Sequence, residues 1–159
     1  MSANTKFHII QEKIILGYYD QLFILIAEWI NKDRSSKESI QLIRFATHLI
    51  LFFFEQGLDV IDQSNTTLLD SCSYILTIYI EYLKHSRQYS LIAYYTSKLP
   101  SNLQVITYAK FLQNIKENAE KEKYLLLAER VNLDVNQITK RVVELICDNP
   151  YPSNVCDLN

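Results

Sequence analysis

The side chains best suited to general acid-base catalysis are scattered along this sequence and form no recognisable site. The histidines are His8, His48 and His85, which lie far apart and match no His-Glu-x-x-His or His-x-x-x-His pattern. His48 falls on the polar edge of an otherwise apolar segment, where a hydrogen-bonded structural role is the simpler interpretation. The sequence therefore offers no general base with a partner at catalytic spacing.

Nucleophilic, metal and phosphate chemistry lack a signature as well. The sequence has an odd number of cysteines, Cys72, Cys147 and Cys156, and no Cys-x-x-Cys pair. This pattern favours a protein of a reducing compartment that holds no structural zinc. The two glycines cannot build a phosphate-binding loop, and no serine lies in a Gly-x-Ser-x-Gly turn. We therefore expect no catalytic, cofactor-binding or metal-binding residue, no cofactor and no enzymatic activity.

Charge and hydropathy exclude further partners. With a net charge of -2, the 159-residue chain has no general attraction for phosphate backbones, so we expect no direct nucleic-acid binding. The most apolar stretch, Ile40 to Phe54, is shorter than the ~20 residues that span a bilayer and is interrupted by polar side chains, so no membrane insertion is expected. No signal peptide is visible at Met1, and no feature predicts a small-molecule substrate.

The composition and the apolar spacing of the chain predict an all-α fold. Glycine and proline are scarce, with 2 and 3 copies, and apolar residues recur three and four apart rather than alternating. About eight helices are expected: Thr5 to Leu16, Asp20 to Ile30, a third ending at Gly57, a fourth reaching Lys84 or Ser86, Tyr89 to Lys98, a sixth through Ile115, a seventh around Tyr124 to Val131, and an eighth to Cys147.

Four helix starts carry a Ser, Thr or Asp followed three residues later by a Glu, Asp or Gln, the pattern of a capping box or related N-cap. These pairs are Ser35 with Glu38, Thr67 with Asp70, Ser101 with Gln104, and Asp134 with Gln137. Between the third and fourth helices, the polar stretch from Asp59 to Thr66 predicts a surface loop.

The third helix carries two apolar rows, which predicts that it is buried on most of its circumference. One row is Leu42, Phe45, Leu49 and Phe52; the other is Ile43, Ala46, Ile50 and Phe53. Short links favour antiparallel neighbours, and the lack of a fixed period excludes a regular tetratricopeptide or ankyrin array. We expect an irregular α-solenoid, formed by residues 1–148 as a single segment, followed by a non-helical tail at 149–159.

Ordered sequence blocks over roughly Phe7 to Ile146 resemble one known family. The blocks are Phe7 to Gln11, Ile14 to Asp20, Leu42 to Phe54 with Gly57-Leu58, Ile78 to Leu83, Leu91 to Tyr95, Leu99-Pro100, Tyr108 to Leu112 and Leu133 to Glu144. In this order they are similar to the eighty-four to hundred-and-seven kilodalton nucleoporin, the long subunit of the nuclear pore's Y-shaped scaffold complex. Family members are several times longer, and the stretch Ile61 to Thr67 is longer than the family leads us to expect.

The resemblance implies a structural scaffold of the nuclear pore at the nuclear envelope. It implies other nucleoporins of the Y-shaped complex as partners, a role in pore assembly, nucleocytoplasmic transport and messenger RNA export, and no enzymatic activity or cofactor. A helical adaptor of a vesicle coat or proteasome lid stays open as the alternative, because it would use the same packing. An enzyme built on a helical fold is the third possibility.

Apolar residues on the first and last helices are the candidates for partner contacts. A solenoid repeat buries its faces against the repeats on either side, so the terminal helices of a segment expose apolar surface. The candidate residues are Phe7, Ile10 and Ile14 at the start, and Val142, Val143 and Ile146 at the end.

Overall fold

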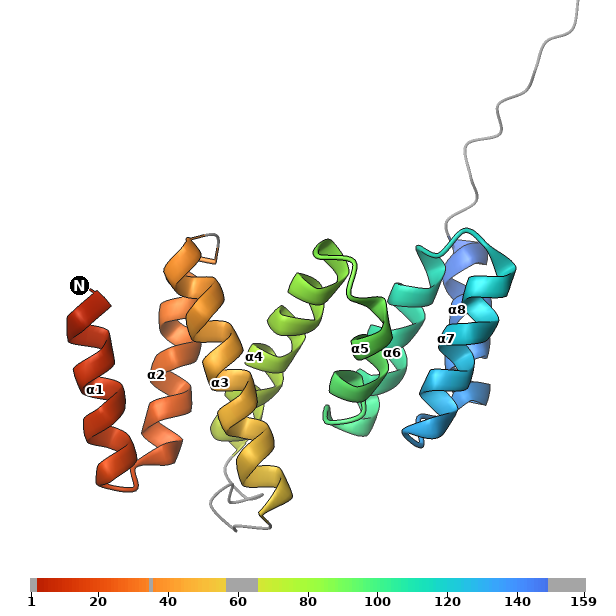
Figure 1. The fold of residues 1–159 in the computed structure, drawn as a ribbon. Coiled ribbons are helices and arrows are strands. Elements are labelled where there is room, and N and C mark those ends of the chain that lie inside the picture. Colours follow the sequence, from red (N-terminus) through yellow and green to blue (C-terminus); the bar gives the residue numbers. More distant parts are fainter. Residues whose placement is uncertain (1–2, 35, 57–65, 149–159) are drawn as a thin grey trace, which may run out of the picture. The chain divides into compact units, whose positions relative to one another are not determined.

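The structure is a computed structural model that describes residues 3–34, 36–56 and 66–148 (Figure 1). Over these ranges the chain forms eight α-helices and no strand, which confirms the all-α prediction. They are α1 (Ala3–Ile15), α2 (Tyr19–Lys32), α3 (Lys37–Glu55), α4 (Thr66–His85), α5 (Tyr89–Thr96), α6 (Ser101–Gln113), α7 (Asn118–Arg130) and α8 (Val135–Asp148). None of these described helices is both long enough and apolar enough to cross a bilayer.

The helices fall into two compact units, residues 1–82 and 83–159, with the boundary inside α4. The first unit holds α1, α2, α3 and most of α4, and the second holds α5 to α8. The predicted non-helical tail, 149–159, and most of the predicted loop after Gly57 lie outside the described residues.

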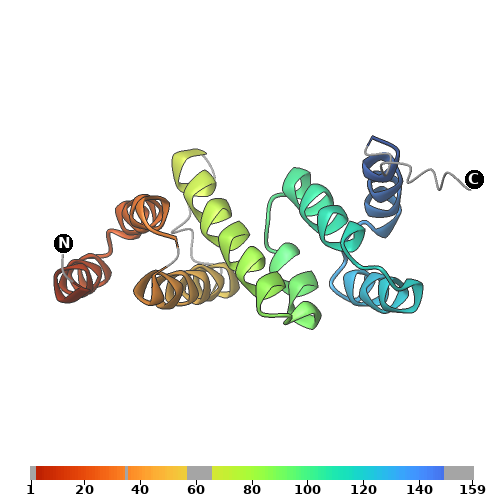
Figure 2. The same ribbon diagram turned by 90° about the horizontal axis from the view of Figure 1, so that it is seen from above.

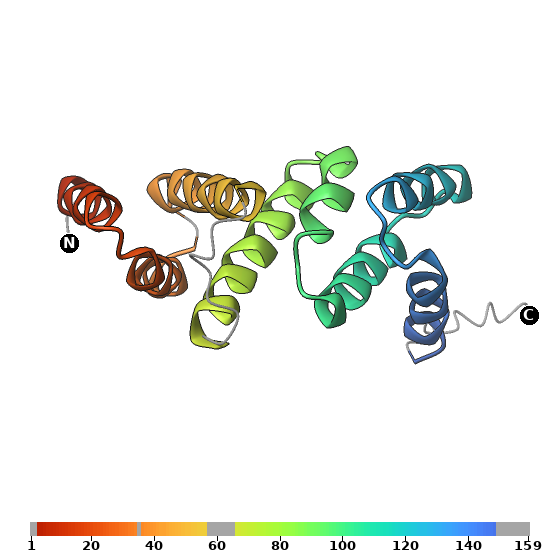
Figure 3. The same ribbon diagram turned by 90° about the horizontal axis from the view of Figure 1, so that it is seen from below.

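The first unit is organised around α2. This helix contacts both α1 and α3, and it lies on one side while α1 and α3 lie on the other (Figures 2 and 3). Helical spacing predicts an inward stripe on α2 of Leu22, Leu25, Ile26, Trp29 and Ile30. This stripe is buried except for the half-buried Leu25, and Trp29 is 7% exposed. Helical spacing thus places one continuous row of α2 in the core.

The second unit is built from two rows of helices. Figures 2 and 3 show α6 beside α8 and α5 beside α7, and the same pairs are in contact, as are α5 and α6. Its core is aromatic: the Phe111 ring lies 5.3 Å from the Tyr124 ring and 5.4 Å from the Tyr108 ring, between centroids. The fully buried Tyr108 hydroxyl donates a hydrogen bond to the backbone oxygen of Tyr124 at 2.7 Å, which ties α6 to α7.

Helix α3 corrects one prediction. Its row Ile43, Ala46, Ile50 and Phe53 is buried, as predicted, but Phe45 is 42% exposed and Phe52 is 52% exposed. The helix is therefore covered on one face and not on most of its circumference. The reason is that both apolar rows have helical spacing, while the described neighbours of α3 cover only one of them.

One of the four predicted caps is confirmed, and the others shift. Asp134 caps α8: its Oδ1 accepts from the backbone N–H of Gln137 at 3.0 Å, and its Oδ2 from the Gln137 side chain at 2.9 Å. For α3 the cap is Ser36, whose hydroxyl accepts from the N–H of Ser39, whereas Ser35 lies outside the described residues.

The other two capping predictions are wrong by at least one residue. Thr67 lies inside α4, which begins at Thr66. Ser101 is the first residue of α6, after Pro100 at the N-cap position, and the side chain of Gln104 donates instead to the carbonyls of Ser97 and Leu99. Gln104 therefore closes the end of α5 and does not complete a capping box.

Candidate partner-binding surfaces

The described residues contain no cluster suited to catalysis or metal binding. No group of three or more His, Cys, Asp or Glu side chains in this part of the chain could hold a metal ion. His8, His48 and His85 lie on α1, α3 and α4, respectively. His48 Nδ1 is 2.7 Å from the backbone oxygen of Arg44, and its ring meets the Tyr79 ring edge-on. These contacts fit the structural role predicted for this histidine.

The strongest pKa shifts in the described chain come from burial. Burial raises the pKa of the Cys72 thiol to about 12, so this cysteine is a buried, protonated core residue and no nucleophile. Burial, followed by repulsion from Tyr124, raises the pKa of Tyr108 well above its ordinary value. Because the Tyr108 hydroxyl already donates to a backbone carbonyl, the shift reflects packing rather than chemistry at a site.

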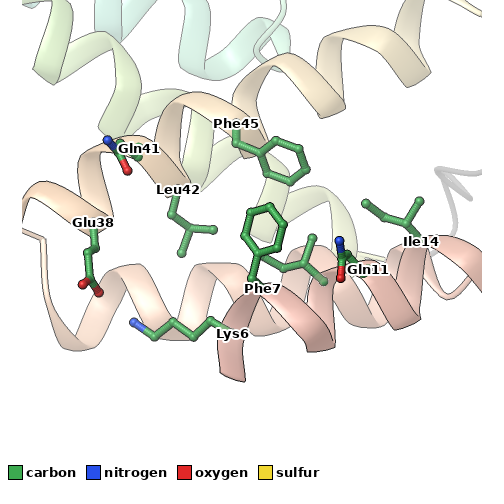
Figure 4. Close-up of a pocket in the computed structure, with 9 residues that line it drawn as sticks. Lys6, Phe7, Gln11, Ile14, Glu38, Gln41, Leu42 and Phe45 are labelled. Atoms are coloured by element: carbon green, nitrogen blue, oxygen red, sulfur yellow. The ribbon is translucent and has the colours of Figure 1, made fainter. Parts of the chain in front are cut away.

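The apolar residues predicted on the first helix line a groove between α1 and α3. Phe7, Ile10 and Ile14 contribute from α1, and Leu42 and Phe45 contribute from α3. The groove holds ≈ 440 Å³, and Figure 4 shows the Phe7 and Phe45 rings pointing toward one another across it.

Exposure differs along this groove. Phe7 is 64% exposed, whereas Ile10 is only 6% exposed and lies at the base of the α1 wall. The polar residues Lys6, Gln11, Glu38 and Gln41 complete the lining. An apolar base with polar edges is typical of surfaces that bind a protein segment.

The predicted residues of the last helix lie on α8, partly covered by α6 and α7. Val143 is 56% exposed and Ile146 is 45% exposed, while Val142 is half-buried. Ile138, one helical turn before Val142 and on the same face, is fully buried. The α8 helix therefore buries one apolar face and leaves a second apolar strip in solvent.

Sequence reasoning missed the contribution of α3 to the groove. Leu42 and Phe45 were assigned to the core because they share a row with helical spacing. Two full apolar rows on one helix indicate that one of them can remain uncovered by the neighbouring helices, but the sequence does not show which row that is.

Comparison with known proteins places this chain in a class of nuclear pore proteins. The family model described as nuclear pore protein 84 / 107 matches residues 1–154. Because the match covers nearly the whole chain, the chain belongs to this family, whose members are structural components and not enzymes. The expectations of family and of no enzymatic activity are confirmed.

Individual relatives agree with the family match. The mouse protein "Nuclear pore complex protein Nup107" is 40% identical over 141 residues, which cover 89% of this chain and 14% of the relative. The human protein of the same name is 39% identical over 140 residues, 88% of this chain and 14% of the relative. The fruit fly Nup107 is 33% identical over 144 residues, 91% of this chain and 16% of the relative. The chain thus spans about 14 to 16% of the length of these curated relatives.

Proposed function

We propose that this chain is a scaffold segment of the nuclear pore complex, located at the nuclear envelope in the Y-shaped complex of the outer ring. In this role it supports pore assembly, and through the pore it supports nucleocytoplasmic transport and messenger RNA export. The observation that carries the proposal is the family match over residues 1–154, since its relatives are named as nuclear pore complex proteins. The partners in this proposal are other nucleoporins of the Y-shaped complex.

The proposed architecture is an irregular α-solenoid with antiparallel neighbours. Within the second unit, α6 contacts α8 and α5 contacts α7, so helices two apart in the sequence stack on each other. Within the first unit, α2 contacts both of its sequence neighbours. Such contacts between near neighbours are typical of helix pairs stacked in a solenoid.

The proposed contacts with neighbouring parts of the scaffold lie on the first and last helices. They are Phe7, Ile10 and Ile14 on α1, and Val142, Val143 and Ile146 on α8. Support comes from the exposure of three of them: Phe7 and Val143 are more than half exposed and Ile146 is 45% exposed, whereas Ile10 is buried.

Affinity purification of the tagged full-length parent protein, followed by identification of the co-purifying subunits, tests the role. We expect nucleoporins of the Y-shaped complex. Recovery of vesicle-coat or proteasome-lid subunits in their place would establish the alternative adaptor function.

Substitutions test the contact residues in the same purification. Val143→Glu should reduce co-purification while leaving the melting temperature nearly unchanged, because this side chain is 56% exposed. Lys140→Glu is the matched control, since it places a carboxylate at an exposed polar position on the same helix. On α1, Ile14→Glu should also reduce co-purification. If Ile14→Glu and Val143→Glu both unfold a wild-type chain that is stable and binds nothing, these residues belong to the core.

A further inference from the structure

The groove between α1 and α3 has two apolar walls that follow the same helical repeat. Phe7, Ile10 and Ile14 follow one another by three and four residues on α1, and Leu42 and Phe45 are three apart on α3. The α3 row continues beyond the groove through Leu49 to Phe52, which is 52% exposed. The exposed apolar surface is therefore elongated along the α3 axis, which suits a rod-shaped ligand better than a small compact molecule.

An elongated groove walled by two helices fits a third helix. An amphipathic helix that enters such a groove presents apolar anchors at i, i+3 or i+4, and i+7, the spacing of both walls here. In the described part of the chain no sheet edge is present to which an extended peptide could add as a strand.

The charged residues at the edge of the groove indicate which charge a docked helix should carry. Lys6 and Glu38 line the same end, from opposite walls (Figure 4). The Lys6 ammonium group lies over the Trp29 ring, 5.8 Å from its centroid, whereas the Glu38 carboxylate has no hydrogen bond or ion pair with any described residue. A docked helix that carries Lys or Arg opposite Glu38 would complement this negative charge.

The lengths of the relatives indicate where such a helix comes from. The matched region makes up 14% of the mouse and human relatives, so most of a family-length protein lies outside it. Helices of the same polypeptide are held near the groove at high effective concentration, which favours them over separate chains of equal intrinsic affinity.

We propose that the α1–α3 groove is a docking site for an amphipathic helix from another part of the family-length protein. The helix inserts an aliphatic row between Phe7 and Phe45 and directs a basic side chain to Glu38. This inference rests on the proposed scaffold function, and it specifies one contact within the scaffold polypeptide itself.

The test uses the 159-residue chain and synthetic peptides of about 25 residues, long enough to form about seven helical turns. Overlapping peptides cover the parts of the human relative that lie outside the matched region, and fluorescence polarisation measures binding. At least one peptide with an apolar i, i+3 or i+4, i+7 row should bind and should gain helical circular dichroism on binding.

Groove variants then locate the bound peptide. Phe7→Glu and Phe45→Glu should weaken its binding at least tenfold, since each places a carboxylate in the apolar groove. Leu126→Glu on α7 is the matched control, because Leu126 is 58% exposed and does not line the groove, and it should leave binding unchanged. Far-ultraviolet circular dichroism verifies that all three variants keep wild-type helicity, as expected for exposed positions.

Two results would overturn the proposal: no peptide binds, or the bound peptide is insensitive to both groove substitutions. Binding only by a helix from a different nucleoporin would also overturn it, since the docked segment would then come from another chain. The scaffold function is tested separately by the affinity purification. Groove binding without co-purifying nucleoporins, or the reverse, shows which of the two proposals has failed.

Discussion

Replacing Phe53 by alanine should destabilise the first unit strongly. Phe53 is 4% exposed, and its ring lies 4.5 Å from the Tyr19 ring and 6.1 Å from the Phe23 ring, between centroids. Truncation removes buried apolar surface and leaves a cavity between α2 and α3, a change that typically costs about 3–5 kcal/mol for phenylalanine. The lost aromatic pairs, at about 0.5–1.5 kcal/mol each, make up part of that cost.

The single tryptophan makes the measurement local. Trp29 lies on α2 and is 7% exposed, so its fluorescence during urea denaturation reports the unfolding of the first unit. Phe52→Ala is the matched control, because it removes the same side chain one residue earlier, where it is 52% exposed. The control should lose no more than about 1 kcal/mol, as expected for a position outside the core.

Two outcomes of the comparison between Phe53→Ala and Phe52→Ala would contradict the predicted burial of Phe53. A loss below about 1 kcal/mol for Phe53→Ala would place this ring at the surface. Equal losses for Phe52→Ala and Phe53→Ala would mean that α3 is rotated relative to α2, and the buried row of α3 would then be wrongly assigned.

Three further predictions concern α8, the cysteines and alkaline pH. Asp134→Ala should reduce the free energy of unfolding by about 0.5–2 kcal/mol through loss of the N-cap, as measured by thermal melting. The control Asn136→Ala, at an exposed position of α8, should cost less, and equal losses for the two variants would contradict the capping role of Asp134. Iodoacetamide at mildly alkaline pH should modify the exposed Cys147 in the folded chain but should modify Cys72 only after denaturation. Peptide mass mapping detects the modified cysteines, and rapid modification of Cys72 in the folded chain would refute its burial. Because burial raises the pKa of Cys72 from 9.0 to about 12, the folded chain keeps a proton that the unfolded chain releases in this interval. The free energy of unfolding should therefore fall as pH rises from 9.0 toward about 12, and a rise of the urea midpoint over that interval would contradict this sign.

Helix existence could be predicted from the sequence because the apolar spacing is local information. For α2, the predicted range Asp20 to Ile30 falls within the observed Tyr19–Lys32, and the inward stripe is the buried one except for the half-buried Leu25. The Asp134 cap could also be predicted from the sequence, because its carboxylate accepts a hydrogen bond from a backbone N–H only three residues away.

Helix ends were harder because different residue types adopt the same terminal geometry. Gly17, Arg87 and Asn132 all have positive φ, of 73°, 58° and 59°, and each lies just after a helix. At each of these ends the next residue donates its N–H back to a carbonyl five residues earlier, the Schellman pattern. Glycine in the sequence indicates such an end because it adopts positive φ at little cost, whereas arginine does not. The predicted first helix, Thr5 to Leu16, accordingly stops directly before Gly17.

The groove could not be predicted because periodicity gives the apolar rows of a helix but not their neighbours. On α3 the row of Ile50 and the row of Leu49 are equally regular, and only tertiary packing decides that the first faces α2 while part of the second lines the groove. A scattered exposed residue such as Leu126 carries little information, since folded proteins expose many apolar side chains. Phe7 and Phe45 are different because they come from two helices and face each other across one groove. For that reason Phe45, which the sequence assigned to the core, belongs to a surface that another helix can cover.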